Sequence, residues 1–200
     1  MERSSREKVS TKAPTSIFLV GFMGAGKTSV GRALGQRLNW LFEDLDERIE
    51  RRQRRSVAEI FRDSGEPAFR RAEHNALREV LDELGGGSLR IVALGGGAFV
   101  QEENADLLLA SGLPTVFLDA PVDELWQRCL NQAEKHQTER PLLSNRDRFR
   151  ELCETRRQSY ARASLTIQTG NREVEAVAAE IAKKLGLKEM AIRSEQGEVE

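Results

Sequence analysis

The sequence predicts an α/β fold in which a parallel sheet of about five strands is covered by helices on both faces. Three observations support this prediction. Short apolar runs alternate with helical patterns along the chain, as is typical of parallel sheets. The 200 residues contain no internal repeat, and 39% hydrophobic with 32% charged residues fits one compact domain. We therefore expect a single α/β domain.

The first elements are a strand, a glycine-rich loop and a helix. The apolar run 17–20 leads into residues 21–28 (GFMGAGKT), which match the P-loop pattern G-x-x-x-x-G-K-[ST]. A helical pattern follows over 28–38 and ends at Asn39. Glycines let a backbone wrap closely around phosphate groups, and a helix N-terminus attracts anions. This stretch predicts nucleotide binding and a P-loop NTPase-type three-layer sandwich.

Individual residues of the P-loop have distinct expected roles. Lys27 can reach the β- and γ-phosphates with its positive charge, and Thr28 can offer its hydroxyl to Mg²⁺. Backbone N–H groups of the loop would bind phosphate oxygens. The expected nucleotide-binding residues are Gly24, Ala25, Gly26, Lys27, Thr28 and Ser29.

Two acids follow the second predicted strand. An apolar run, 40–42, is followed by residues 43–46 (EDLD) and then by a charged helix through Arg55. The D-x-D pattern lies at the carboxyl end of a strand, where open α/β sheets bind their ligands. In an extended segment, alternation would place Asp44 and Asp46 on the same side. An acid here can also cap the following helix, and the position after a P-loop favours a role in binding.

The next segment predicts two helices separated by a turn. Ser56 is expected to cap a short helix that ends near Phe61. The turn 63–67 contains glycine and proline and opens a longer helix over 68–84.

Arg70 lies in the first turns of this longer helix. The helix dipole disfavours a cation there, so a partner is expected: Glu66, Glu73 or an anionic ligand. His74 has no second ligand-like residue at metal spacing. It is expected to be a surface or interhelical histidine.

Two glycine triplets flank the third predicted strand, 90–94. The first, 85–87, is expected to be a flexible connector. The second, 95–97, follows the strand directly, so a ligand or neighbouring backbone is expected to approach too closely for side chains. The strand ends in no acid, which leaves Asp44 as the nearest carboxylate for a metal.

The second half of the chain continues the alternation. Helices are predicted over 102–110, 122–130, 146–161 and 174–185, and strands over 115–118 and 164–168. Residues 131–145 are polar and without periodicity. They predict a mobile lid that closes over phosphate, with Arg140 as its cation. The other interpretation of this segment is a disordered loop.

Composition limits the partners and the location. The formal net charge of −1, from 31 basic and 32 acidic residues, provides no general attraction for nucleic acid or anionic membranes. Cys129 and Cys153 form no disulfide framework, and no stretch approaches the roughly 18 apolar residues of a membrane span. We expect a cytoplasmic protein with a disordered N-terminal extension (1–15), one domain (16–186) and a polar C-terminal tail (187–200).

Six ordered features together resemble the shikimate kinase family across about residues 16–186. They are the P-loop, the D-x-D, Phe69-Arg70-Arg71, Gly95-Gly96-Gly97, Arg140-Pro141-Leu142-Leu143 and Arg156-x-x-x-Tyr160. The resemblance implies an enzyme that uses ATP and Mg²⁺ to phosphorylate shikimate at its 3-hydroxyl, in aromatic amino-acid biosynthesis.

The resemblance also implies residue roles. Asp46 would bind the shikimate hydroxyls and act as the base, and Asp44 would hold Mg²⁺ together with Thr28. Lys27 and Arg140 would stabilise the transferring phosphoryl group. The remaining implied contacts are Arg70 and Arg156 with the substrate carboxylate, Gly96 and Gly97 with the substrate through backbone N–H groups, and Arg128 with adenine.

Some positions depart from the usual family pattern. Gln158 replaces the proline of R-x-P-x-Y, which leaves Arg157 as a rival of Arg156 for the carboxylate. The segment from Arg128 to Arg140 is several residues longer than usual, and Ala93 or Leu94 replaces a hydroxyl residue. Two alternatives stay open: a related kinase of another polyol acid such as gluconate, and a kinase-like module that binds its ligands without transfer. A monomer is expected, because no heptad or apolar stripe indicates assembly.

Overall fold

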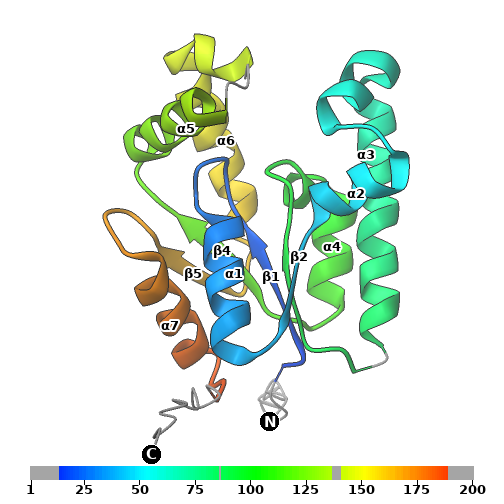
Figure 1. Ribbon diagram of the computed structural model, residues 1–200, viewed down its shortest axis with the longest axis vertical. Coiled ribbons are helices and arrows are strands. Elements are labelled where there is room, and N and C mark those ends of the chain that lie inside the picture. Colours follow the sequence, from blue (N-terminus) through cyan, green and yellow to red (C-terminus); the bar gives the residue numbers. More distant parts are fainter. Residues whose placement is uncertain (1–13, 86, 137–140, 189–200) are drawn as a thin grey trace, which may run out of the picture.

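A computed structural model describes residues 14–85, 87–136 and 141–188. Five parallel strands form one sheet in the order β2-β3-β1-β4-β5 (Figure 1). The strands are β1 (Ser16–Val20), β2 (Leu41–Asp44), β3 (Arg90–Ala93), β4 (Thr115–Asp119) and β5 (Leu165–Gln168). This confirms the predicted α/β sandwich with a sheet of about five strands.

Helices cover both faces of the sheet. They are α1 (Lys27–Leu38), α2 (Leu45–Gln53), α3 (Val57–Leu84), α4 (Glu102–Ala110), α5 (Val122–His136), α6 (Arg146–Tyr160) and α7 (Val174–Lys184), with 3₁₀ turns η1 (Ala98–Val100) and η2 (Pro141–Ser144). Helices α1 and α7 pack together on one face, while α3, α4 and α6 meet around η1 on the other side (Figure 1). Each described helix is too short or too polar to cross a membrane.

The central strand explains where the site lies. The side chains of Ile17, Phe18 and Leu19 in β1 are fully buried, because β1 has a neighbouring strand on each side and a helical layer on each face. The chain forms β2 and β3 on one side of β1 before it crosses to β4. In such sheets ligands bind outside the carboxyl ends of the strands at this change of direction.

The β2–α2 junction corrects one prediction. Strand β2 continues to Asp44 and α2 begins at Leu45, so Asp46 lies in the first turn of a helix. The argument from alternation along an extended segment was therefore wrong. The two acids are still neighbours, because Asp44 is the N-cap of α2 and accepts a hydrogen bond from the backbone N–H of Asp46 at 3.0 Å.

Helix α5 is longer than predicted. It was expected to end at residue 130, but it continues to His136, so the first part of the predicted lid is helical. Residues 131–135 (NQAEK) include strong helix formers that carry no apolar periodicity, which explains why the pattern failed to predict them. Residues 137–140, and Arg140 with them, lie outside the described part of the chain. So do residues 1–13 and 189–200, most of the predicted terminal segments.

The two helices predicted after Ser56 are joined into α3. Ser56 caps the helix, and Glu59 completes a capping box with it. Helical geometry is interrupted at Gly65, whose φ of 77° and ψ of 167° are accessible to glycine but rarely to other residues. The predicted turn is therefore a break inside one element.

An ion cluster ties the β2–α2 junction to its surroundings. Glu43 accepts hydrogen bonds from Arg48 at 2.8 Å and from Arg90 at 2.9 Å. Both arginines also bond Glu83 near the end of α3, Arg90 at 2.7 Å. Glu43, Arg48 and Arg90 are only 13–15% exposed, so this cluster restrains the residue that precedes Asp44.

Candidate active site

The P-loop between β1 and α1 has the geometry that its sequence predicts. Gly21, Gly24 and Gly26 have φ values of 142°, 78° and 91°, which other residues rarely adopt. A Cβ at Gly24 would also lie 2.7 Å from the carbonyl oxygen of Leu125. Helix α1 begins at Lys27, so its positive end faces the loop, as an anion site requires.

Lys27 folds back over the loop. Its Nζ donates to the carbonyl oxygens of Gly21 at 2.9 Å and Phe22 at 3.0 Å. Burial lowers the pKa of Lys27, while Asp46 and Asp44 raise it. The ammonium group thus lies in the curve of the P-loop, close enough to both acids to interact with them.

Thr28 and Asp44 bring two oxygen ligands together beside the P-loop. Thr28 Oγ1 donates to Asp44 Oδ2 at 3.0 Å, while Asp44 Oδ1 caps α2. Asp44 is therefore a helix cap, one of the two interpretations considered from the sequence, and it lies at the carboxyl end of β2. Mg²⁺ prefers such oxygen ligands and usually takes only one or two from the protein. Among the described residues, no group of three or more His, Cys, Asp or Glu could hold a metal ion.

Asp46 presents an acceptor oxygen inside the site. Its Oδ1 is buried and has no hydrogen-bond partner among the described residues. Burial, and after it the charge of Asp44, raises the pKa of Asp46 to about 6, although Lys27 acts in the opposite direction. A buried carboxylate with a free oxygen and a raised pKa can accept a proton from a ligand hydroxyl.

Each glycine of the second triplet lies against a different part of the site. A Cβ at Gly95 would lie 2.6 Å from Asp46 Oδ1, and a Cβ at Gly97 would lie 2.5 Å from Arg70 Nη1. A Cβ at Gly96 would lie 3.7 Å from a backbone nitrogen of the P-loop. Gly95 and Gly97 thus have no room for a Cβ, but their close neighbours are side chains and not the predicted ligand or backbone, and the distance at Gly96 is an ordinary contact.

Arg70 has both of its predicted carboxylate partners. Its Nη1 donates to Glu73 Oε2 and its Nη2 to Glu66 Oε1, each at 2.9 Å. Glu73 is fully buried, and its Oε1 has no partner within the described chain. Burial raises the pKa of Glu73 to about 7 against the opposing effect of Arg70. Sequence reasoning treated Glu73 only as an ion-pair partner, because the i,i+3 spacing shows that the two side chains can meet but not that the acid is buried.

The structure shows that Arg156 and Arg157 have different hydrogen-bond partners. Arg156 Nη1 donates to the carbonyl oxygen of Gly96 at 3.3 Å, and the Tyr160 hydroxyl donates to the same oxygen. Arg157 instead donates to Asp119 Oδ1 through Nε at 3.1 Å and Nη2 at 2.7 Å. Successive residues on a helix point in different directions, so only Arg156 faces the glycine loop.

Arg128 lies beside the P-loop on α5. Its Nη1 donates to the carbonyl oxygen of Gly24 at 3.3 Å, and its Nη2 donates to Glu124 Oε1 at 2.5 Å and to the Thr169 carbonyl at 2.7 Å. It therefore joins the phosphate loop to the loop between β5 and α7. Ser29, also predicted as a nucleotide ligand, is exposed.

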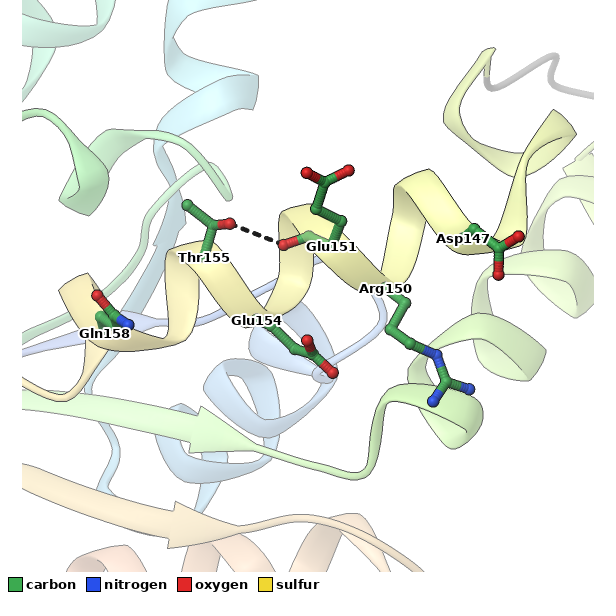
Figure 2. Close-up of a pocket in the computed structure, with 6 residues that line it drawn as sticks. All are labelled: Asp147, Arg150, Glu151, Glu154, Thr155 and Gln158. Atoms are coloured by element: carbon green, nitrogen blue, oxygen red, sulfur yellow. Dashed lines mark hydrogen bonds between the residues drawn. The ribbon is translucent and has the colours of Figure 1, made fainter.

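A separate shallow cavity of about 350 Å³ lies along α6 (Figure 2). It is lined by Asp147, Arg150, Glu151, Glu154, Thr155 and Gln158, and the Thr155 hydroxyl bonds the backbone of Glu151 at 2.8 Å. Helical periodicity places these residues on the side of α6 opposite Arg156 and Tyr160. This cavity is therefore not part of the site.

The fold and the site define a P-loop kinase that acts on a small molecule. The P-loop lies beside a cluster of charged side chains, Asp46, Arg70 and Arg156. These three residues come from α2, α3 and α6, and all of them meet at the glycine loop after β3.

Comparison with known proteins narrows this class. The family model for shikimate kinase matches residues 23–186. The shikimate kinase of Cereibacter sphaeroides is 36% identical over 197 residues, which cover 97% of this chain and 94% of the relative. The solved shikimate kinase of Acinetobacter baumannii, in complex with shikimate, has a TM-score of 0.76 and 33% identity, covering 87% of this chain and 93% of that one. The chain belongs to the shikimate kinase family.

A more distant likeness shows the fold alone. A gluconokinase from Sinorhizobium meliloti 1021 has a TM-score of 0.52 and 20% identity, covering 88% of this chain and 93% of that chain. The acceptor of this chain therefore has to be argued from its own residues.

Proposed function

We propose that the protein transfers the γ-phosphoryl group of ATP to the 3-hydroxyl of shikimate. The observation that carries this proposal is the convergence of Asp46, Arg70 and Arg156 on the loop of three glycines beside the P-loop. The carboxylate of Asp46 can bind substrate hydroxyls, and the guanidinium groups of Arg70 and Arg156 can bind a substrate carboxylate. This combination suits a small polyhydroxylated acid.

Arg70 is in a suitable state to bind the substrate carboxylate. Glu73 is buried and stays paired with it, whereas the side chain of Glu66 is 61% exposed. The substrate carboxylate can replace Glu66 at little cost, because an exposed ion pair contributes little. Arg156, which donates to the Gly96 carbonyl, then binds the same carboxylate, while the backbone N–H groups of Gly96 and Gly97 bind the substrate.

The reaction is an in-line displacement at phosphorus. The 3-hydroxyl oxygen forms a bond to the γ-phosphorus, and the bond from that phosphorus to the β–γ bridging oxygen breaks, so ADP leaves. The hydroxyl proton passes to the carboxylate of Asp46. Lys27 moves from the loop carbonyls to the β- and γ-phosphates and balances their charge. Arg140, outside the described residues, is proposed to add a second positive charge when the lid closes.

Thr28 and Asp44 are proposed to hold Mg²⁺, which would neutralise charge on the phosphates when bound. The other chain groups of the nucleotide site are the backbone of residues 24–29 and the guanidinium of Arg128, which is proposed to lie against adenine. We further propose that the enzyme acts as a monomer in the cytoplasm. Size-exclusion chromatography with light scattering tests the oligomeric state.

A coupled ADP-release assay tests the function. Four conditions are compared: shikimate, gluconate, a nucleoside monophosphate and no acceptor. Turnover with shikimate, and ³¹P NMR that places the phosphate on the 3-oxygen, would support the proposal. Turnover with gluconate alone would assign the chain to another acceptor. Binding of shikimate without turnover under any condition would indicate a non-catalytic module.

A further inference from the structure

A buried amide supports the glycine loop from behind. Asn104 on α4 is 1% exposed, and its Nδ2 donates to the carbonyl oxygen of Ala98 at 3.1 Å. Its Oδ1 lies 2.7 Å from Nδ1 of His74 on α3. Ala98 directly follows Gly97, so two hydrogen bonds in sequence connect α3, α4 and the loop.

Hydrogen-bond chemistry determines which nitrogen of His74 carries the proton. The carbonyl oxygen of Ala98 can only accept, so the NH₂ group of Asn104 must point toward it. The Oδ1 of Asn104 therefore faces His74 and needs a donor there. It follows that Nδ1 of His74 carries a hydrogen and donates it to Asn104.

We propose that His74 and Asn104 are positioning residues for the acceptor site, an inference that rests on the proposed role of this loop in binding the acceptor. His74 lies one helical turn after Arg70 on α3, and Ala98 lies one residue after Gly97. The bridge therefore joins the helix that carries Arg70 to the loop against which Arg70 rests.

The bridge holds in place the contact between Gly97 and Arg70, and this contact tolerates little displacement. Gly97 leaves no room for a Cβ beside the guanidinium of Arg70. The backbone N–H of Ala98 donates to the carbonyl of Gly95 at 3.1 Å, so a shift of Ala98 moves the whole turn. Without these two hydrogen bonds, the position of the loop relative to Arg70 is less well fixed. The acceptor carboxylate then binds less tightly.

Steady-state kinetics with both substrates test this proposal. Asn104→Ala is expected to raise the KM for shikimate about 10- to 100-fold, as small displacements of binding groups do, and to leave the KM for ATP unchanged. His74→Leu is expected to act in the same direction. His74→Asn restores the KM, because its Nδ2 is attached to Cγ, as is Nδ1 of histidine, and can donate to Asn104. Glu103→Ala, at the exposed neighbouring position on α4, is the matched control and changes neither KM.

Asn104→Asp separates the two hydrogen bonds. Aspartate keeps an acceptor for His74 but has no donor for the Ala98 carbonyl, so its KM for shikimate is expected to resemble that of Asn104→Ala. Ring ¹⁵N chemical shifts provide a readout beyond activity. They should show His74 protonated on Nδ1 in the wild type and on Nε2 in Asn104→Ala.

Clear results would overturn the inference. An unchanged KM for shikimate in His74→Leu would overturn the positioning role. Because His74 is only half-buried, this variant provides the test even if Asn104→Ala fails to fold. A wild-type His74 protonated on Nε2 alone would also do so. A wild type without shikimate turnover would instead refute the proposed function, and calorimetric titration of the same variants with shikimate would then decide whether the bridge positions a binding site.

Discussion

Gly97 and the guanidinium of Arg70 lie so close together that any side chain at position 97 would collide with it. A Cβ there would lie 2.5 Å from Nη1 of Arg70. The same guanidinium donates a hydrogen bond to Glu73. The location of this positive charge therefore depends on the missing side chain at position 97.

Gly97→Ala is expected to displace Arg70 and raise the KM for shikimate about tenfold or more. The backbone of Gly97, with φ −106° and ψ −13°, accommodates alanine, so the melting temperature should stay close to that of the wild type. Kinetics with both substrates and a thermal melt check this. In an Arg70→Ala background the added methyl group should have no further effect, and additive effects would show that it acts elsewhere.

Asp46→Asn is expected to bind ATP normally and to lower kcat by roughly 10²- to 10⁴-fold, because the amide cannot take the hydroxyl proton. Single-turnover kinetics and nucleotide titration measure the two quantities separately. Glu47→Gln, at the next and exposed position, is the control. Near-normal turnover of Asp46→Asn would remove Asp46 from the role of base.

Asp44→Asn separates the cap from the metal site. Asparagine caps helices about as well as aspartate, so the free energy of unfolding should change little. The Mg²⁺ concentration at half-maximal rate should rise, because a charged ligand is lost. Asp44→Ala removes the cap as well and should also lower the unfolding free energy by about 1 kcal/mol. An unchanged Mg²⁺ dependence in both variants would contradict the proposed metal site.

Arg156→Ala should change substrate binding, whereas Arg157→Ala should change only stability. Arg156→Ala is expected to raise the KM for shikimate with little effect on stability. Arg157→Ala breaks a partly exposed pair with Asp119 and should lower the unfolding free energy by only about 0.5 to 1 kcal/mol, with both KM values retained. The reverse pattern in the two KM values would assign the carboxylate to Arg157.

Glu73 predicts a pH dependence of stability. Its pKa in the folded protein is about 7, above the ordinary value of 4.5, so the folded state holds the proton more tightly. The contribution to the unfolding free energy is therefore fully present below about 4.5 and is lost as the pH rises through 7. Glu73→Gln should remove this dependence, at most about 3 kcal/mol. Denaturant unfolding at pH 5 and pH 8 checks this, with Glu66→Gln as the exposed control, and parallel profiles for wild type and Glu73→Gln would exclude it.

Much of the architecture was predictable because its signals are local. The strand, P-loop and helix at the start of the domain are contiguous, and the P-loop depends on the conformational freedom of a few glycines. The glycine triplet after β3 indicated a close approach because its residues lack a Cβ. What no local pattern could supply was the identity of the neighbours, since Asp46 and Arg70 reach the triplet from α2 and α3.

The features that the sequence did not predict were missed for physical reasons. Ala133 is the single apolar residue in 131–136, so a segment with helix propensity and no apolar periodicity was taken for a loop. Arg156 and Arg157 are adjacent in sequence, and only the rotation of α6 distinguishes them. The bridge from His74 to Asn104 joins residues 30 positions apart, beyond any short-range pattern.

Strand β2 forms an edge of the sheet, and an unpaired edge is a place where a second molecule can add a strand. Leu41 at its start is 67% exposed and would favour such pairing. The ion cluster around Glu43 opposes it, because an incoming strand would have to bury or break those charge pairs. The charges that restrain the residue before Asp44 thus also protect the folded enzyme against edge-to-edge aggregation.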